Sequence, residues 1–271
     1  MNSRTTATTN LTFGQHLDEL RRRIVRIVAV VVVLAVCVFY FKQQVFDILL
    51  APCSPDFVSF RMLRDMLSAL GLDADIFSGN LPLIATDISS QFMAHLSVSV
   101  YLGILLASPF ILHQILGFVL PALYDNEKRY AITLLRSVYL LFFAGLAVAY
   151  LILFPISCRF LAGYSVSSSV TSLITLDSYL SLFISLSLLM GLVFQLPIVS
   201  LTLARMGLID AEFMSKYRRH ALIAIMVVAA IITPPDILTL LIVTLPLYCL
   251  YELSILGVRM RGLKKQHTTS A

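Results

Sequence analysis

The chain has 271 residues, of which 59% are hydrophobic and only 13% are charged. Soluble domains are about 45–50% apolar and about 25% charged, so this composition excludes an ordinary soluble globular protein and indicates an integral membrane protein. The net charge of +5 raises the question of nucleic-acid binding, which depends on where the basic residues lie.

The first predicted element is an amphipathic helix that runs directly into a membrane span. Phe13, Leu17 and Leu20 recur at helical spacing, and charged residues occupy another face. The apolar run at 24–41 has 18 residues, which reach about 27 Å as a helix and just cross a hydrocarbon core of ~30 Å. Four arginines at the start of this run predict that this end is cytoplasmic: Arg21, Arg22, Arg23 and Arg26.

The apolar segments that follow predict a single all-α transmembrane domain over residues 11–260. We expect six spans, at about 24–41, 95–118, 132–154, 179–203, 221–232 and 237–257. Pro155 is expected to end the third span, and Asp177 to cap the fourth. The last two spans are expected to be short for a bilayer. Residues 1–10 are expected to be disordered, and 261–271 to form a cytoplasmic tail with a disordered end.

The distribution of charge decides how often the chain crosses the membrane. The turn at 233–236 contains two prolines, and the apolar segments around it form either one re-entrant hairpin or two spans. With six crossings and both termini cytoplasmic, 16 of the 20 Lys and Arg residues lie on the cytoplasmic side, and the remaining four are Lys42, Arg61, Arg64 and Arg159. Basic residues concentrate in cytoplasmic loops, so this distribution favours six spans in a lipid bilayer and requires no nucleic-acid partner.

Sequence motifs for catalysis and cofactor binding are missing. The sequence has no H-E-x-x-H, P-loop or dinucleotide fingerprint, and Gly163-Tyr164-Ser165 lacks the second glycine of a nucleophile elbow. None of the four cysteines lies in a C-x-x-C pair, so we expect no metal, no cofactor and no enzymatic activity. Cys53 and Cys158 both fall in segments assigned outside the cytoplasm, where they either form a disulfide or remain thiols that pack as small apolar groups.

Two acidic residues are candidates for a binding site on the cytoplasmic side. Glu19 lies on the first helix and Glu127 in the next cytoplasmic loop, both just outside the hydrocarbon. A carboxylate can bind a guanidinium group through two hydrogen bonds, so this pair suits a peptide with two arginines followed by an apolar stretch. The alternative is purely structural, since Asp18–Arg22 and Glu19–Arg23 have the spacing of ion pairs along a helix.

Polar residues also lie inside or beside the later spans. Gln195 precedes Pro197 by two positions, and it either faces a functional interior or satisfies carbonyls that the proline leaves free. Glu252, near the end of the last span, either reaches the interface, pairs with Arg259 or is protonated. In the outer turn, Asp236 most simply caps the sixth helix.

Seven short motifs occur in a fixed order along the predicted domain. They are H-L-D-E-L-R-R-R (16–23), A-P (51–52), I-A-T-D (84–87), S-P-F-I-L-H-Q (108–114), G-F-V-L-P-A-L-Y-D-N-E (117–127), F-Q-L-P (194–197) and T-P-P-D (233–236). In this combination the chain resembles the TatC family, the polytopic subunit of the twin-arginine protein translocase. The resemblance implies a cup-shaped bundle of six helices, with both termini cytoplasmic, in the cytoplasmic (inner) membrane of a bacterium.

The same resemblance implies a function and partners. The protein would be a receptor for folded cargo that carries a twin-arginine signal peptide, with export driven by the proton-motive force. Its partners would be small single-span proteins of the TatA/TatB type and further copies of the chain itself. Glu19 and Glu127 would contact the arginine pair, and Arg21 and Phe118 would shape the same patch.

Three further positions receive roles from the resemblance. Pro52 and Asp236 would belong to a structured outer cap. Gln195 stands where many relatives have a membrane-buried glutamate, which puts in doubt any role that needs a charge there and leaves hydrogen bonding to a partner helix. The outer loop at 53–80 is longer than the resemblance leads us to expect.

Two other function classes are alternatives. A secondary transporter of a small solute would need inverted repeats with broken helices around a midplane site, and only Gln195 and Pro197 hint at one. An intramembrane protease would need a buried nucleophile and base, but no serine motif accompanies His113.

Overall fold

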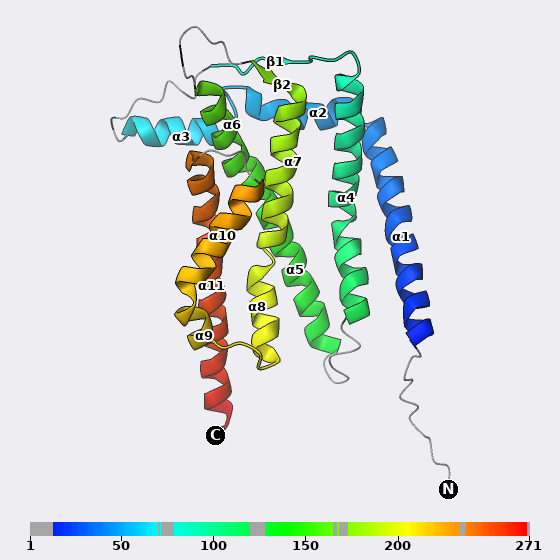
Figure 1. The fold of residues 1–271 in the computed structure, drawn as a ribbon, viewed down its shortest axis with the longest axis vertical. Coiled ribbons are helices and arrows are strands. Elements are labelled where there is room, and N and C mark those ends of the chain that lie inside the picture. Colours follow the sequence, from blue (N-terminus) through cyan, green and yellow to red (C-terminus); the bar gives the residue numbers. More distant parts are fainter. Residues whose placement is uncertain are drawn as a thin grey trace.

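Helices form almost all of the structure, a computed structural model that describes residues 13–69, 71, 79–119, 128–164, 167, 173–232 and 237–269 (Figure 1). The α-helices are α1 (Phe13–Tyr40), α2 (Lys42–Leu50), α3 (Val58–Ala69), α4 (Ser90–Val119), α5 (Lys128–Val148), α6 (Phe154–Gly163), α7 (Leu176–Val193), α8 (Leu196–Arg205), α9 (Ala211–Lys216), α10 (Arg218–Ile232) and α11 (Ile237–Thr269). Within these ranges the only strands are β1 (Leu83–Ile84) and β2 (Ile174–Thr175), which pair in parallel. The all-α fold class is confirmed.

The two ends of the bundle differ in what they carry (Figure 1). We call the end with α2, α3, β1 and β2 the cap end. The opposite end, which we call the terminal end, holds the start of α1, the last turn of α4, and the end of α11. The first helix therefore begins at the same end of the molecule at which the last helix finishes.

Five stretches of the described chain are long and apolar enough to cross a membrane: Leu17–Tyr40, Ser90–Ile115, Arg136–Gly163, Leu176–Ala204 and Leu240–Met260. The predicted fifth span coincides with α10, whose 15 residues reach only about 22 Å. In contrast, α11 has 33 residues, because no proline follows Pro246 and the helix continues through the basic tail. The expectation of a short sixth span is therefore wrong, and so is that of a disordered tail as far as Thr269.

Pro155 does not end the third span, contrary to our expectation from the sequence. The chain makes a π-helical turn at Ala149–Leu153, where the N–H of Phe154 donates to the carbonyl of Ala149, and then continues as α6. The wider turn shifts the hydrogen-bond register, so the missing N–H of proline falls in the first turn of a new helix, where it costs little. The third span therefore reaches the cap end as one continuous run.

The fourth span also differs from expectation. Thr175, and not Asp177, caps α7, since Thr175 Oγ1 accepts a hydrogen bond from the N–H of Ser178 at 3.2 Å. Asp177 lies in the first turn, where a negative charge still favours the positive end of the helix dipole. The helix breaks after Val193 and resumes as α8 at Leu196, immediately before Pro197.

Aromatic residues of α6 and α7 form a buried cluster in the core. Phe154 packs edge-on against Tyr179 and Phe183, with ring centroids 4.9 and 5.3 Å apart. Nearby, α5 approaches α7 so closely that a Cβ on Gly145 would lie 2.6 Å from the carbonyl oxygen of Met190. Because apolar burial drives little helix association in lipid, such close contacts at small residues hold the helices together.

The helix α1 stands at the edge of the bundle and packs against α4 (Figure 1). At Gly103 of α4, an added Cβ would lie 2.8 Å from the backbone of Ala35 on α1, so the two helices touch at backbone distance. Most of the remaining surface of α1 is exposed in the protein, as expected for a lipid-facing helix. This contact fixes the start of α1 relative to the end of α4, where the candidate site lies.

Candidate functional site

Glu19 lies in the second turn of α1 at the terminal end and forms an ion pair along the helix. Arg23 donates to Glu19 Oε1 from Nη2 at 2.5 Å and from Nε at 3.0 Å. The Glu19 side chain is 38% exposed, against 19% for Arg23. Both bonds end on the same oxygen, so no described residue donates to Oε2. Of the two ion pairs that the spacing predicts, the described residues contain Glu19–Arg23 but not Asp18–Arg22, and the Glu19 side chain remains partly exposed.

Arg23 also joins the start of α1 to the end of α4. Its Nη1 donates to the carbonyl oxygen of Gln114 at 2.9 Å and lies 3.5 Å from the Gln114 side-chain oxygen. The arginine therefore holds the Glu19 carboxylate with two nitrogens and the last turns of α4 with the third. Hydrogen bonds to charged groups are worth about 1.5–3 kcal/mol, less where solvent screens them, so this bridge helps to orient Glu19.

The other predicted members of this patch follow Gln114 along the chain. Phe118 lies one helical turn later on α4, although only its backbone belongs to the described part of the structure. Glu127 lies outside the described residues, in the segment between Val119, which ends α4, and Lys128, which begins α5. Glu19 therefore lies beside the helix whose C-terminal end leads into the loop that carries Glu127.

Arg21 lies on a different part of the α1 surface from Glu19. It lines a shallow hollow with Asp18, Arg22, Val25 and Arg26, at the level where α1 enters its apolar run. Three cations against one carboxylate make this surface basic, which suits the anionic headgroups of a membrane surface. In the described structure Arg21 makes no hydrogen bond to Glu19, so any role in one patch with Glu19 remains a prediction.

Gln195 lies at the break between α7 and α8 and bonds to two carbonyls. Its Nε2 donates to the carbonyl of Val138 on α5 at 3.2 Å and to that of Gly191 at 3.4 Å. The backbone N–H of Gln195 donates instead to Leu192, so the Gly191 carbonyl lacks its usual helical partner. This geometry supports a helix–helix hydrogen bond, the plainer of the two interpretations of Gln195.

The cap end is organised by a residue that the sequence analysis did not single out. Pro52 is buried in a 3-10 turn, Ala51–Cys53, that follows α2. Arg159 of α6 is almost fully buried beside this turn, and its Nη2 donates to the carbonyl of Cys53 at 3.2 Å. Its guanidinium also lies 4.7 Å from the ring centroid of Phe60, a cation–π contact, and Nη1 donates to the carbonyl of Gly79. The sequence does contain a signal for this role, because Arg159 is a single positive charge inside a mostly apolar run.

Two predictions near the α10–α11 turn have different outcomes. Asp236 lies outside the described residues, so its capping role stays a prediction. Glu252 pairs with Arg218 of α10, and not with Arg259, through two contacts of 2.9 Å, Nε to Oε1 and Nη2 to Oε2. Antiparallel helices joined by a short connection bring together residues equally far from it, which sets Arg218 opposite Glu252. Spacing along one helix cannot reveal this partner, because Arg218 belongs to a different helix.

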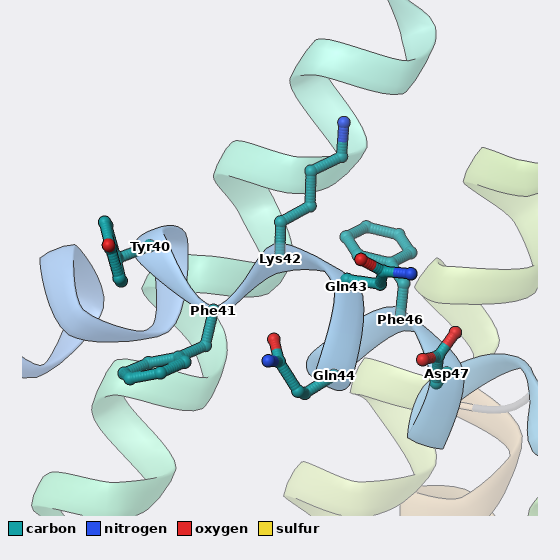
Figure 2. Close-up of a pocket in the computed structure, with 7 residues that line it drawn as sticks. All are labelled: Tyr40, Phe41, Lys42, Gln43, Gln44, Phe46 and Asp47. Carbon is teal, nitrogen blue, oxygen red and sulfur yellow. The ribbon is translucent and has the colours of Figure 1, made fainter.

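A second hollow lies far from Glu19, at the elbow between α1 and α2 on the cap end. Figure 2 shows its lining residues, which are Tyr40, Phe41, Lys42, Gln43, Gln44, Phe46 and Asp47. Behind the elbow, His95 of α4 is buried, stacks on Phe39 and hydrogen-bonds its carbonyl at 3.2 Å. The hollow is thus a feature of a fixed elbow and contains none of the predicted site residues. Among the described residues, no three His, Cys, Asp or Glu side chains gather where they could hold a metal ion.

Comparison with known proteins gives one consistent family. The family model described as Sec-independent protein translocase protein (TatC) matches residues 15–246. The Sec-independent protein translocase protein TatC of Desulforapulum autotrophicum is 35% identical over 253 residues, which cover 93% of this chain and 86% of that protein. The Sec-independent protein translocase protein TatC of Escherichia coli strain K12 is 31% identical over 245 residues, which cover 89% of this chain and 85% of that protein.

A solved structure agrees with the sequence relatives. The crystal structure of a twin-arginine translocase receptor, TatC, superposes with a TM-score of 0.71 at 31% identity, and the match covers 90% of this chain and 98% of that one. These matches give no support to a secondary transporter. The matched family is a component of a protein translocase and is not known as an enzyme family. The chain belongs to the TatC family and is a membrane-embedded component of the Sec-independent protein translocase.

Proposed function

We propose that this protein binds the twin-arginine signal peptides of folded cargo at its terminal end, through Glu19 and Glu127. The contact between Arg23 and Gln114 is the observation that carries the proposal. It sets Glu19 of α1 beside the end of α4, and the chain that follows α4 carries Glu127 only eight residues beyond Val119. We infer from this connection that one short peptide reaches both carboxylates.

The chemistry of Glu19 suits a guanidinium ligand. A carboxylate accepts up to four hydrogen bonds, and Arg23 uses only one of the two oxygens. An incoming arginine binds the open oxygen or displaces Arg23, while Glu127 binds the second arginine of the pair. Because the site lies just outside the hydrocarbon, the apolar stretch that follows the arginines in a signal peptide can enter the membrane beside α1 and α4.

We further propose that the terminal end faces the cytoplasm and that the domain at 11–260 crosses the membrane six times. The basic residues support this orientation, since 16 of 20 lie in segments that it assigns to the cytoplasm, including the tail at 261–271. In this topology α10 is the fifth span. Its 15 residues need a locally thinner bilayer. A translocase can use such thinning to move its cargo across the membrane.

The proposed complex lies in the inner membrane of a bacterium and includes TatA/TatB-type single-span proteins and further copies of this chain. The proton-motive force drives transport, and the chain itself carries no catalytic group. Gln195 contributes a hydrogen-bonding position for a partner helix: its Nε2 is used within the protein, and no described residue donates to its Oε1. Pro52 and Asp236 belong to a structured cap on the outer side of the membrane.

The arginine pair itself provides the test of this proposal. A peptide in which both arginines are replaced by lysines is expected to bind the purified full-length protein about 10-fold more weakly, because lysine offers a point charge in place of a planar fork. Titration of labelled peptides followed by fluorescence anisotropy, at one fixed salt concentration, measures the ratio. Equal affinity for the two peptides would mean that a general attraction of positive charge, and not guanidinium recognition, underlies binding.

A further inference from the structure

Two cysteines from distant parts of the chain come together at the cap end. Cys53 closes the 3-10 turn Ala51–Cys53, and Cys158 lies in the middle of α6. Cys158 is 4% exposed, Cys53 is half-buried, and both pack in the same apolar cluster. The other two cysteines, Cys37 and Cys249, are exposed on α1 and α11.

Tyr179 of α7 shows how the two cysteine-bearing segments converge. Its hydroxyl donates to the carbonyl of Leu49 at 2.8 Å, four residues before Cys53. Its ring packs edge-on against Phe154, one helical turn before Cys158 on α6. The segments that carry the two thiols therefore approach the same tyrosine from two sides.

A second contact joins the two segments directly. Arg159, the residue next to Cys158, donates from Nη2 to the carbonyl oxygen of Cys53 at 3.2 Å. The same arginine bonds to Gly79 and lies over the Phe60 ring, so its position is held from three directions. The backbone of Cys53 thus stays beside the turn of α6 that carries Cys158.

The surroundings of Cys53 determine how it reacts. Burial raises the pKa of the Cys53 thiol, while the nearby Arg159 guanidinium opposes this effect. A raised pKa means that little thiolate is present at neutral pH and more as the pH increases. We therefore expect Cys53 to be oxidised slowly at pH 7 and faster in mildly alkaline solution.

We propose that Cys53 and Cys158 are a redox pair that closes to a disulfide and fastens the turn after α2 to α6. The proposal rests on the topology above, in which the cap end lies outside the cytoplasm, where disulfides persist. The oxidant is a protein or small-molecule disulfide. The more accessible Cys53 thiolate attacks it and releases one thiol, and the Cys158 thiolate then attacks the Cys53 sulfur and releases the second. Two protein thiols are oxidised, one external disulfide is reduced, and the two protons leave on the released thiols.

The test counts free thiols in the purified full-length protein. After incubation with oxidised glutathione at about pH 8.5, near the usual thiol pKa, denaturation and labelling with maleimide-polyethylene glycol are expected to show loss of two of the four free thiols. Dithiothreitol restores all four, and mass spectrometry finds a Cys53–Cys158 peptide. The Cys37→Ser/Cys249→Ser double variant still loses two thiols, and Cys53→Ser retains its three. Cys158→Ser lacks the second thiol and is expected to stop at a mixed disulfide of Cys53 with glutathione. In the wild-type protein, four free thiols, a stable glutathione adduct on Cys53, or a bridge to Cys37 or Cys249 would overturn the pair.

The same labelling in membranes separates this inference from the proposed function. With thiols trapped at lysis, we expect the pair to be oxidised in cells. A pair that closes in detergent but stays reduced in cells contradicts the orientation of the cap end and so overturns the proposal as stated. In either case, Cys53→Ser is expected to leave binding of a twin-arginine peptide unchanged, because Glu19 lies near the start of α1, and α1 begins at the opposite end of the bundle.

Discussion

Replacing Glu19 with lysine is expected to weaken binding of a twin-arginine peptide by roughly 10- to 100-fold, and Glu127→Lys is expected to do the same. In the proposed site, each substitution removes the carboxylate for one guanidinium group and adds a like charge that repels it. Hydrogen bonds to charged groups contribute about 1.5–3 kcal/mol each, which corresponds to this range of affinity. Peptide titration with the purified full-length variants measures the effect.

The chain offers a matched control for charge reversal at this surface. Asp18 is the neighbour of Glu19 but faces the hollow lined by Arg21 and Arg22. Asp18→Lys changes the net charge by the same amount, and we expect at most a small loss of peptide affinity from it. If Asp18→Lys weakened binding as much as Glu19→Lys, the effect would be one of overall charge, and the assignment of Glu19 as a guanidinium ligand would be wrong.

Gly145→Ala is expected to destabilise the protein by about 1–3 kcal/mol, the usual cost of forcing extra atoms into a packed interface. The added Cβ would lie 2.6 Å from the carbonyl oxygen of Met190 and 2.9 Å from the ring of Phe194. The first neighbour is backbone of α7 and cannot rotate away, so α5 and α7 must separate. Thermal unfolding of the detergent-purified protein is expected to show a lower midpoint.

Gly163→Ala is the control for this substitution. Gly163 ends α6, and an added Cβ there meets nothing within 4 Å. Alanine lowers the entropy of the unfolded chain relative to glycine, so this variant is expected to be neutral or slightly more stable. Equal midpoints for Gly145→Ala and Gly163→Ala would show that α5 and α7 do not rely on close contact at Gly145.

The fold class could be predicted from the sequence because membrane spans are recognisable from their long apolar runs. Every predicted span falls on a helix of the structure, since about 20 apolar residues in a row have few alternatives in lipid. The ends of these helices were less predictable. Pro155 is tolerated because a π-helical turn absorbs it, and Thr175 replaces Asp177 as cap because β2 ends one residue before α7 begins. Both outcomes depend on hydrogen bonds that apolar periodicity does not reveal.

Contacts between distant segments account for what the sequence analysis missed. From the sequence, Arg159 is only one of four basic residues on the outer side. In the structure it bonds to Cys53 and Gly79, which are 106 and 80 residues away along the chain. Glu252 pairs with Arg218 across the α10–α11 turn. Neither partner can be inferred from spacing along one helix, because each depends on how two helices are placed side by side.

The candidate site contains one contact that the sequence predicts and one that it does not. The Glu19–Arg23 pair follows from helical spacing alone, and the structure contains it. The link from Arg23 to Gln114 does not follow from spacing, and it is this link that brings the first acidic residue beside the end of α4. The remaining step, a joint contact of Glu19 and Glu127 with one ligand, stays a prediction.

Photo-crosslinking from the ligand measures that step most directly. A twin-arginine peptide with a photoreactive residue directly beside the arginine pair is bound to the purified protein, irradiated, and mapped by mass spectrometry. We predict adducts both in the first turns of α1, around residues 16–23, and in the segment at 120–128, with loss of both when the peptide carries two lysines. Adducts confined to one of these segments, or located at the cap end, would contradict a single binding surface formed by Glu19 and Glu127.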